Sequence, residues 1–356
     1  MNKAILAVMI AAMLTGCAIG PDYRRPAIDT PGAWRVAEQE AKDTANTAWW
    51  RQFDDSVLNG LVDAALRENR DLRTATARVE EYVGRYWTGR SGLFPQIGGD
   101  AAAGRSRATQ EGAAPLSSAV KNPSESYQAG FSGSWEIDIW GKLRRATEAA
   151  KADLLATGEA RQAVILSLVG AVATGYINLR DLDRQLEVAE RTAATREESY
   201  RLFKLRYQGG VISELELNQV KSEYEQALAT IPQIEKQISF QENGLSMLLG
   251  KNPGPIPRGK DMDALVLPAV PAGLPSDLLT RRPDIRQAEQ MLIAANARIG
   301  VARAGYFPTI SLTGLFGWSS TELSNLFTGP ARVWTWSGAV AAPIFTGGAI
   351  AGQVKT

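Results

Sequence analysis

The residue types that most often carry out chemistry are scarce in this chain. Its 356 residues include no histidine and one cysteine, Cys17. The commonest general base and metal ligand is therefore missing, and only one thiol is present. Carboxylates are numerous, but the pattern places them on helix faces of mixed charge that contact water. No glycine-rich phosphate loop of the Walker type occurs in the sequence. We expect no enzyme, no bound cofactor and no metal site.

Cys17 is placed for covalent modification. It ends the sequence Leu14-Thr15-Gly16-Cys17, after the apolar run Ala4–Leu14, which is typical of a secretory signal and too short to span a bilayer stably. The four residues resemble the bacterial lipobox, where a peptidase cuts before a cysteine that receives acyl chains; a chance cysteine is the alternative. We expect residues 1–16 to be a signal peptide and Cys17 to be the lipid attachment site. Ala18 stands where the inner-membrane retention signal has aspartate, so the resemblance indicates the outer membrane.

Composition sets broad limits on the rest of the chain. Apolar residues make up 45% of it, and its length allows two or three ordinary domains. Lys and Arg number 39 and Asp and Glu number 38, a balance that does not indicate a nucleic-acid partner. Residues 17–50 carry several prolines and no clear period, so we expect them to form a lipid-anchored tether.

Two long helical patterns dominate the middle of the sequence. Apolar residues recur at alternating steps of three and four from Ile165 to Tyr207 and again from Leu217 to Leu248, which predicts a pair of coiled-coil seams. The interruptions are few: Gly175 and Arg196 in the first seam and Gln241 in the second. A solvated two-helix spacer is the simplest alternative for this stretch alone.

The first of these helices is expected to run from Lys142 to Gln208, about 100 Å at 1.5 Å per residue. Gly209-Gly210 would form the turn as the helix C-cap, and Ser213 would be the N-cap of the returning helix. Pro232 lies inside the returning helix and is expected to kink it.

Four stretches have the alternation of β-strands. The clearest is Tyr127–Ile139; a weaker one runs from Ile97 to Ala103, and two more are Ile310–Trp318 and Trp334–Ile344. A strand of about 9 to 11 residues with one apolar and one polar face crosses a bilayer when tilted. A half-buried strand of a soluble sandwich is the alternative. The direct run of the clearest strand into the long helix favours the membrane.

The second half of the chain repeats the first. Asp71-Leu72-Arg73 recurs as Asp284-Ile285-Arg286, and Phe94-Pro95 recurs as Phe307-Pro308, both shifted by 213 positions. We therefore divide the chain into repeat 1 (51–250: helices, two strands, a helical hairpin), a proline-rich linker (251–274), and repeat 2 (275–356: a helix, two strands and the start of a second hairpin). The second hairpin would follow the last residue, so we expect a C-terminally truncated product that assembles poorly.

Four membrane strands cannot close a barrel, and open strand edges are not tolerated in lipid. Two copies would give eight strands, whose interior is filled by side chains, and three would give twelve, which begin to leave a lumen. We expect a homotrimer and a fold class of α+β membrane protein: an outer-membrane β-barrel with four strands per protomer, continuous with a long α-helical coiled-coil barrel.

Five motifs spread over the chain carry a family resemblance. They are Gly20-Pro21-Asp22-Tyr23 after Cys17, Trp49-Trp50, Asp138-Ile139-Trp140-Gly141, the helix end from Leu248-Leu249-Gly250 to Pro253, and Arg282-Pro283-Asp284-Ile285-Arg286. Together they resemble the TolC-like outer-membrane efflux protein family, most closely its lipoprotein branch of nodulation-type and multidrug efflux. The resemblance implies a trimeric duct of twelve strands and a periplasmic helical barrel. It also implies docking through a periplasmic adaptor (membrane fusion) protein onto an inner-membrane RND-type pump that supplies the energy.

In that family the hairpin tips meet the adaptor. The matching first tip here comprises Gln208, Gly209, Gly210, Val211, Ile212 and Ser213. The family's principal gating residues lie mostly on the second tip, so none is assigned. Two other functions stay open: an outlet for protein secretion, which shares the architecture, and a non-conducting coiled-coil lipoprotein scaffold.

Overall fold

The computed structural model describes residues 18–28, 48–109, 111, 121–266 and 278–356. The predicted signal peptide, Cys17 and most of the predicted tether lie outside the described residues. The chain divides into two compact units. One comprises Met1–Ala27, Glu80–Ala156 and Gln287–Thr356; the other comprises Ile28–Val79 and Thr157–Arg286.

The second unit is built on a helical hairpin. Helix α4 spans Lys142–Gln208, the bounds expected from the sequence, and α5 spans Glu214–Leu248. The residues that interrupt the two seams contact each other or an opposite charge. The side-chain amide of Gln241 donates to the carbonyl of Gly175 at 2.8 Å, and Arg196 pairs with Glu223 at 2.5 Å. The polar interruptions are therefore fixed contacts between α4 and α5.

The core of this unit lies at the base of the hairpin. The helical turn η1 (Trp49–Phe53), α2 (Ser56–Glu68) and the start of α3 (Arg70–Ser91) contribute to one buried cluster with α4 and α5. Its largest fully buried side chains are Leu58, Val62, Val172, Tyr176, Leu179, Leu245 and Leu249. The hairpin is thus held by packing at one end.

A buried carboxylate fastens the proline-rich linker to this core. Asp55 caps α2 by accepting from the backbone N–H groups of Val57 and Leu58, at 2.8 and 3.1 Å. It also accepts from the Tyr176 hydroxyl and from the N–H of Lys260, both at 2.9 Å. Four donors surround one side chain that is 1% exposed. The linker is therefore a strap packed on the helices.

A glycine allows that approach. A Cβ on Gly259 would lie 2.3 Å from a carboxylate oxygen of Asp55, and the N–H of Gly259 donates to the Tyr176 hydroxyl at 2.9 Å. Arg180 secures the following residues, since its guanidinium donates to the Lys260 carbonyl and to Asp261. After the strap come the turn η2 (Met262–Ala264) and, beyond the next gap, α6 (Leu278–Arg281).

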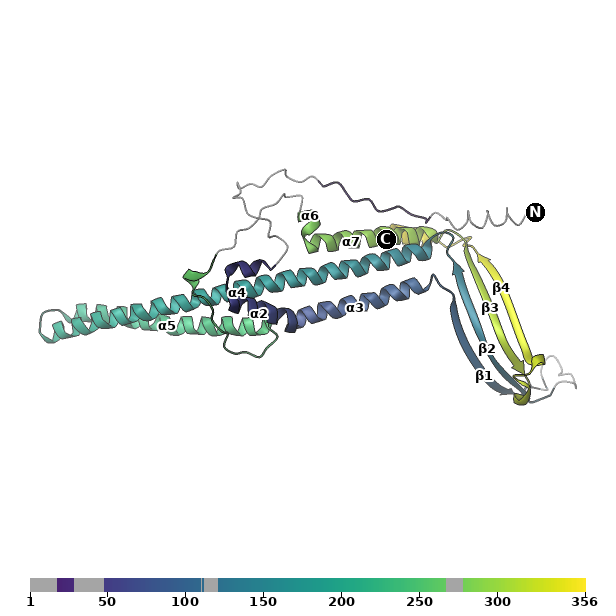
Figure 1. The fold of residues 1–356 in the computed structure, drawn as a ribbon, viewed down its shortest axis with the longest axis horizontal. Helices are drawn as coiled ribbons and strands as arrows, with labels where there is room; N and C mark the ends of the chain where they lie inside the picture. Colours follow the sequence, from purple (N-terminus) through teal and green to yellow (C-terminus); the bar gives the residue numbers. More distant parts are fainter. Residues whose placement is uncertain (1–17, 29–47, 110, 112–120, 267–277) are drawn as a thin grey trace. The chain divides into compact units, whose positions relative to one another are not determined.

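The first unit carries an antiparallel sheet in the order β1-β2-β3-β4 (Figure 1). The strands are β1 (Gln96–Ser106), β2 (Ser124–Ile137), β3 (Thr309–Ser320) and β4 (Arg332–Ala341). Short turns η4 (Leu323–Asn325) and η5 (Gly329–Ala331) connect β3 to β4, and α8 (Ala349–Lys355) follows β4.

The structure keeps the spacing of the sequence repeat. Helix α7 spans Pro283–Ala304, so both its ends lie 213 positions after those of α3, and β3 begins 213 positions after β1. Each helix leads into its strand through a Phe-Pro pair, because proline cannot continue the helical hydrogen bonds.

Two strands stop before their expected ends, whereas the other strand ends lie one to three residues outside the predicted ranges. Strand β2 stops at Ile137, two residues early, because Asp138 turns to cap α4 and accepts from the N–H groups of Leu143 and Arg144 at 3.1 and 2.8 Å. Strand β4 stops at Ala341 and not at Ile344, since Pro343 has no N–H for the ladder.

Among the described helices, only α4 contains a window of 18 residues apolar enough to cross a membrane, with a mean hydropathy of 1.5. Of that window, 39% is buried within the structure. The apolar face of α4 supplies the core at the hairpin base, which accounts for this composition.

The Asp55 contacts predict how stability depends on pH. Burial acts to raise the pKa of Asp55, but the four hydrogen bonds to its carboxylate prevail and lower it. A lowered folded-state pKa adds stability above the unfolded value, about 3.9, that is lost as the pH falls through the folded value. We expect Asp55→Asn to remove this part of the pH dependence, measured by chemical unfolding of the helical signal between neutral and acid pH.

Tyr176→Phe is the matched control. It removes one donor to the same carboxylate and the acceptor of the Gly259 N–H, at a cost of about 1 kcal/mol for each hydrogen bond, but leaves the charge in place. Its unfolding free energy should be lower at neutral pH, and its acid-dependent part should be smaller than in the unaltered chain but not abolished, because three donors to the carboxylate remain. An unchanged pH dependence in Asp55→Asn would contradict the role given to this carboxylate.

Candidate functional site

The four-stranded sheet separates apolar from polar side chains completely enough to assign its two faces. Residues directly opposite each other on paired strands share a face. Phe131 lies opposite Phe316, which lies opposite Trp334. The same face carries Ile97, Ala101, Tyr127, Ala129, Trp135, Ile137, Ile310, Leu312, Trp318, Trp336 and Val340. Most of the large side chains on it are exposed in the single chain, Trp336 by 75%.

The opposite face is polar and small. Serine, threonine, glutamine, glycine and alanine fill it, with Leu315 and Val333 the largest apolar members. Only two of its residues are charged, Asp100 and Glu136. A sheet with one apolar face and one polar face is typical of the wall of a membrane β-barrel.

The apolar face has the height of a hydrocarbon layer. It extends along β2 from Ile137 to Tyr127, which is about 34 Å of strand and about 26 Å of membrane normal at a tilt of roughly 40°. Beyond Tyr127 the face ends at an ion pair between Arg105 and Glu125, 3.6 Å apart. Near the other end, the indole N–H of Trp135 donates to the Leu93 carbonyl at 3.1 Å.

The two outer strands leave the sheet open. Among the described strands, β1 pairs only with β2 and β4 pairs only with β3. Each outer strand therefore presents a row of backbone N–H and C=O groups that no described strand of its own chain pairs with, and lipid cannot satisfy them. The sheet can stay in a membrane only if strands of other chains pair with these edges.

The Asp138-Ile139-Trp140-Gly141 motif makes the junction between sheet and helix. The Trp140 indole N–H donates to the Pro308 carbonyl at 2.7 Å, and its ring packs on Phe307 with centroids 4.9 Å apart. Gly141 has a φ of +75°, which favours glycine. The motif thus ties the start of α4 to the corresponding junction of the second repeat.

The segment that follows Cys17 packs on this junction. The N–H of Ile19 donates to the Trp140 carbonyl at 3.0 Å. Gly20 approaches Gly300 of α7 so closely that a Cβ on Gly20 would lie 2.5 Å from the Gly300 Cα. The buried guanidinium of Arg145 donates to Asp22 at 2.6 Å. These contacts give the Gly-Pro-Asp-Tyr motif a physical role as a clip on α4 and α7.

The predicted tip residues form a tight, ordered turn. Gly210 has a φ of +71°, and the N–H of Val211 donates back to the Arg206 carbonyl at 3.0 Å, as in a glycine-terminated helix. Ser213 and Glu216 then form a reciprocal capping box that starts α5. Hydrogen bonds from Ser213 lower the pKa of the Glu216 carboxyl.

Apolar side chains project from this tip into solvent. Val211 is 74% exposed, and Leu215 and Tyr207 are also exposed. The structure therefore brings the six predicted residues, Gln208 to Ser213, into one turn and adds the neighbouring Leu215, which the sequence pattern had not singled out.

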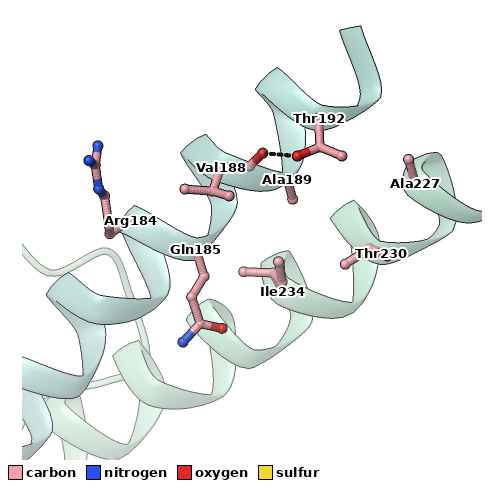
Figure 2. Close-up of a pocket in the computed structure, with 8 residues that line it drawn as sticks. All are labelled: Arg184, Gln185, Val188, Ala189, Thr192, Ala227, Thr230 and Ile234. Atoms are coloured by element: carbon pink, nitrogen blue, oxygen red, sulfur yellow. Dashed lines mark hydrogen bonds between the residues drawn. The ribbon is translucent and has the colours of Figure 1, made fainter. Parts of the chain in front are cut away.

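A shallow groove lies between α4 and α5 farther along the hairpin (Figure 2). It has a volume of about 410 Å³ and is lined by Arg184, Gln185, Val188, Ala189, Thr192, Ala227, Thr230 and Ile234. Small residues on both helices, Ala189 and Ala227, leave this space, because larger seam residues would fill it. The Thr192 hydroxyl is used within α4, where it donates to the Val188 carbonyl at 2.8 Å.

Comparison with known protein families identifies the family to which this chain belongs. A family model described as outer membrane efflux protein matches residues 61–251 and 274–356. The chain belongs to this family. The resemblance drawn from the sequence motifs is thereby confirmed, and so is the expectation that the chain is not an enzyme.

Individual members of the family are similar over nearly the whole chain. The solvent efflux pump outer membrane protein SrpC of Pseudomonas putida is 37% identical over 94% of this chain and 73% of its own length. The cation efflux system protein CusC of Escherichia coli O157:H7 is 34% identical over 97% of this chain and 74% of its own length.

Solved structures agree with this assignment. The open state of the Neisseria gonorrhoeae MtrE outer membrane channel superposes with a TM-score of 0.84 at 31% identity, over 95% of this chain and 75% of that one. The outer-membrane channel OprN gives a TM-score of 0.86 at 29% identity, over 95% and 76%. These matches confirm the α+β outer-membrane fold, in which four strands per chain lead into long helices.

Proposed function

We propose that this chain is the outer-membrane channel of a tripartite efflux system that exports small molecules. The observation that carries the proposal is the two-faced sheet with two open edges, because a wall of this kind is useful only as part of a closed conduit. The long hairpin would continue that conduit into the periplasm. The names of the relatives, which include solvent, toluene, cation and antibiotic efflux, favour small molecules as cargo.

A homotrimer satisfies the open edges best. Three chains supply twelve strands, and at a spacing of about 4.8 Å and a tilt near 40° such a barrel has a backbone radius of about 12 Å. That radius leaves a water-filled lumen lined by the polar face. Eight strands from two chains would place the same serines and threonines in a packed interior, where fewer of them could be solvated.

We infer the partners from the hairpin tip and from the predicted lipid anchor. The tip, from Gln208 to Ser213, would contact a periplasmic adaptor protein, which would connect the channel to an inner-membrane RND-type pump. Lipid attached to Cys17 would anchor the chain in the outer membrane beside the junction, because Ala18 lies against Gly141. No energy source is needed within the channel itself.

Two alternative functions would use some of the same structural features. An outlet for protein secretion would use the same wall and the same hairpin, and only the cargo separates it from the main proposal. A non-conducting scaffold would account for the hairpin but gives no role to the polar face of the sheet.

The channel proposal predicts conductance from a trimer. The trimers that form, although expected in low yield from this chain, should give discrete conductance steps in planar bilayers, and crosslinking in detergent should give the mass of three chains. Loss of the gene should sensitise the cell to toxic small molecules and leave protein secretion intact. A stable monomer or dimer, or bilayers without conductance, would refute the proposal.

A pair of glycine variants makes this test specific for the sheet. A Cβ on Gly317 would lie 2.5 Å from the Ala129 carbonyl oxygen on the neighbouring strand, whereas a Cβ on Gly338 meets only a Leu312 methyl at 3.5 Å. Gly317→Ala should lower the yield of conducting trimers several-fold, and Gly338→Ala should not.

Adaptor contact at the tip predicts a local effect of shape. Gly210→Val forces a β-branched residue into a left-handed conformation, which costs about 1 kcal/mol or more and displaces Val211. Co-purification of the adaptor should fall strongly. Gly244→Val in α5 is the control, because nothing lies within 4 Å of a Cβ there. Equal adaptor binding by both variants would argue against the tip as the contact.

Lipidation of Cys17 predicts a modified N-terminus. Mass spectrometry of the mature protein should find an acylated Cys17 as the first residue, and Cys17→Ser should remove the added mass and retain an uncut signal peptide. A mature chain that begins elsewhere or carries no acyl chain would exclude the anchor.

A further inference from the structure

We propose that Asp100 selects the charge of what passes through the sheet lumen, so that cations are favoured over anions. This inference rests on the proposed function, because it requires a closed barrel. The charges in question lie on the polar face of the sheet, and the structure describes every residue of the four strands.

The charge balance of the polar face is one-sided. Asp100 on β1 and Glu136 on β2 are its only charged residues, and it has no lysine or arginine. Glu136 is paired with Lys142 of α4 at 3.6 Å. Asp100 makes no hydrogen bond or ion pair within the described part of the chain, and its side chain is exposed. One carboxylate per chain therefore stays uncompensated.

The row that contains Asp100 keeps space around the carboxylate. Across the sheet this row reads Asp100, Gly130, Gly317 and Val333, so the next two strands present no side chain. Neither glycine can be enlarged without strain, since a Cβ would approach the facing backbone to 3.0 Å at Gly130 and 2.5 Å at Gly317. The carboxylate stands above bare backbone, open to water and ions.

Closure by other chains would not neutralise this charge. Strand β1 is an edge of the sheet, and in a closed ring it would pair with β4 of the next chain. The polar face of β4 consists of Val333, Thr335, Ser337, Ala339 and Ala341, none of which is basic. Three Asp100 carboxylates would thus form one ring inside the barrel.

The radius of the barrel determines how strong the electrostatic potential of the three carboxylates is at the barrel axis. With a radius of about 12 Å, the axis lies roughly one Debye length from the wall at 0.1 M salt and about four at 1 M. Coulomb's law with this screening gives a preference for cations over anions of about threefold at 0.1 M and almost none at 1 M. The salt dependence is a signature that a steric filter would not have.

The test is the reversal potential of the reconstituted full chain under a potassium chloride gradient. Asp100→Asn should lower the cation-to-anion permeability ratio about threefold near 0.1 M salt and should leave the conductance at 1 M salt unchanged. Asp100→Lys should reverse the preference, so that anions are favoured. Glu125→Gln is the matched control, because it neutralises a carboxylate of the same sheet on the apolar face; its ratio should not change.

The possible outcomes separate the two proposals. Conducting channels in which Asp100→Asn retains the permeability ratio, or in which Glu125→Gln lowers it equally, overturn the Asp100 inference and leave the channel in place. Failure of the unaltered chain to conduct overturns the proposed function and, with it, the role of Asp100.

Discussion

The unpaired backbone groups on the outer edges of β1 and β4 are the constraint on which the other features depend. In water such edges are tolerable, but in hydrocarbon each unsatisfied group costs several kcal/mol. Because side chains alternate along the strands, one face of the sheet carries large apolar residues, including Phe131, Trp334 and Trp336, whose exposure to water is unfavourable. Only a closed ring of strands resolves both demands. The conduit is therefore a consequence of the sheet's chemistry as well as of its family.

In each of the two units, a glycine and a buried charged side chain determine how closely an extended segment approaches the helices. Gly20 meets Gly300, and Gly259 meets Asp55, each at a separation that no Cβ could share. In both places a nearby ionic or hydrogen-bonded group fixes the approach: Arg145 with Asp22, and Asp55 with Tyr176. Extended segments that lack a hydrophobic stripe of their own are thus held by a few specific contacts against the helices.

The sequence predicted elements well where the signal is local. The bounds of α4 follow from the Gly209-Gly210 end and the Asp138-Ile139-Trp140-Gly141 start, and Ser213 is the N-cap of α5 as expected. The sheet registers agree with the alternation because a slip of one residue would exchange the faces. The shift of 213 positions even gives the end of α7, since a repeated Phe-Pro pair stops both helices.

Contacts between distant segments could not be predicted in the same way. Gly175 and Gln241 are only interruptions of two seams until the hairpin places them opposite each other, when the amide meets the carbonyl. Asp55 is a helix cap in sequence terms, and its two further donors come from Tyr176 and Lys260, more than a hundred residues away. The importance of Asp100 likewise depends on the register, because the pattern of β1 alone is weak and only its partners show which face is polar.

The duplication within the chain has a further consequence for assembly. Strands β2 and β3 join the two repeats through a ladder of eleven residue pairs, so one of the two kinds of joint in a closed ring already exists before any chains meet. A ring of six single repeats would lose translational and rotational freedom five times, whereas three duplicated chains lose it twice. Since each loss is estimated at 4 kcal/mol or more, covalent linkage of the repeats lowers the concentration at which the ring can form.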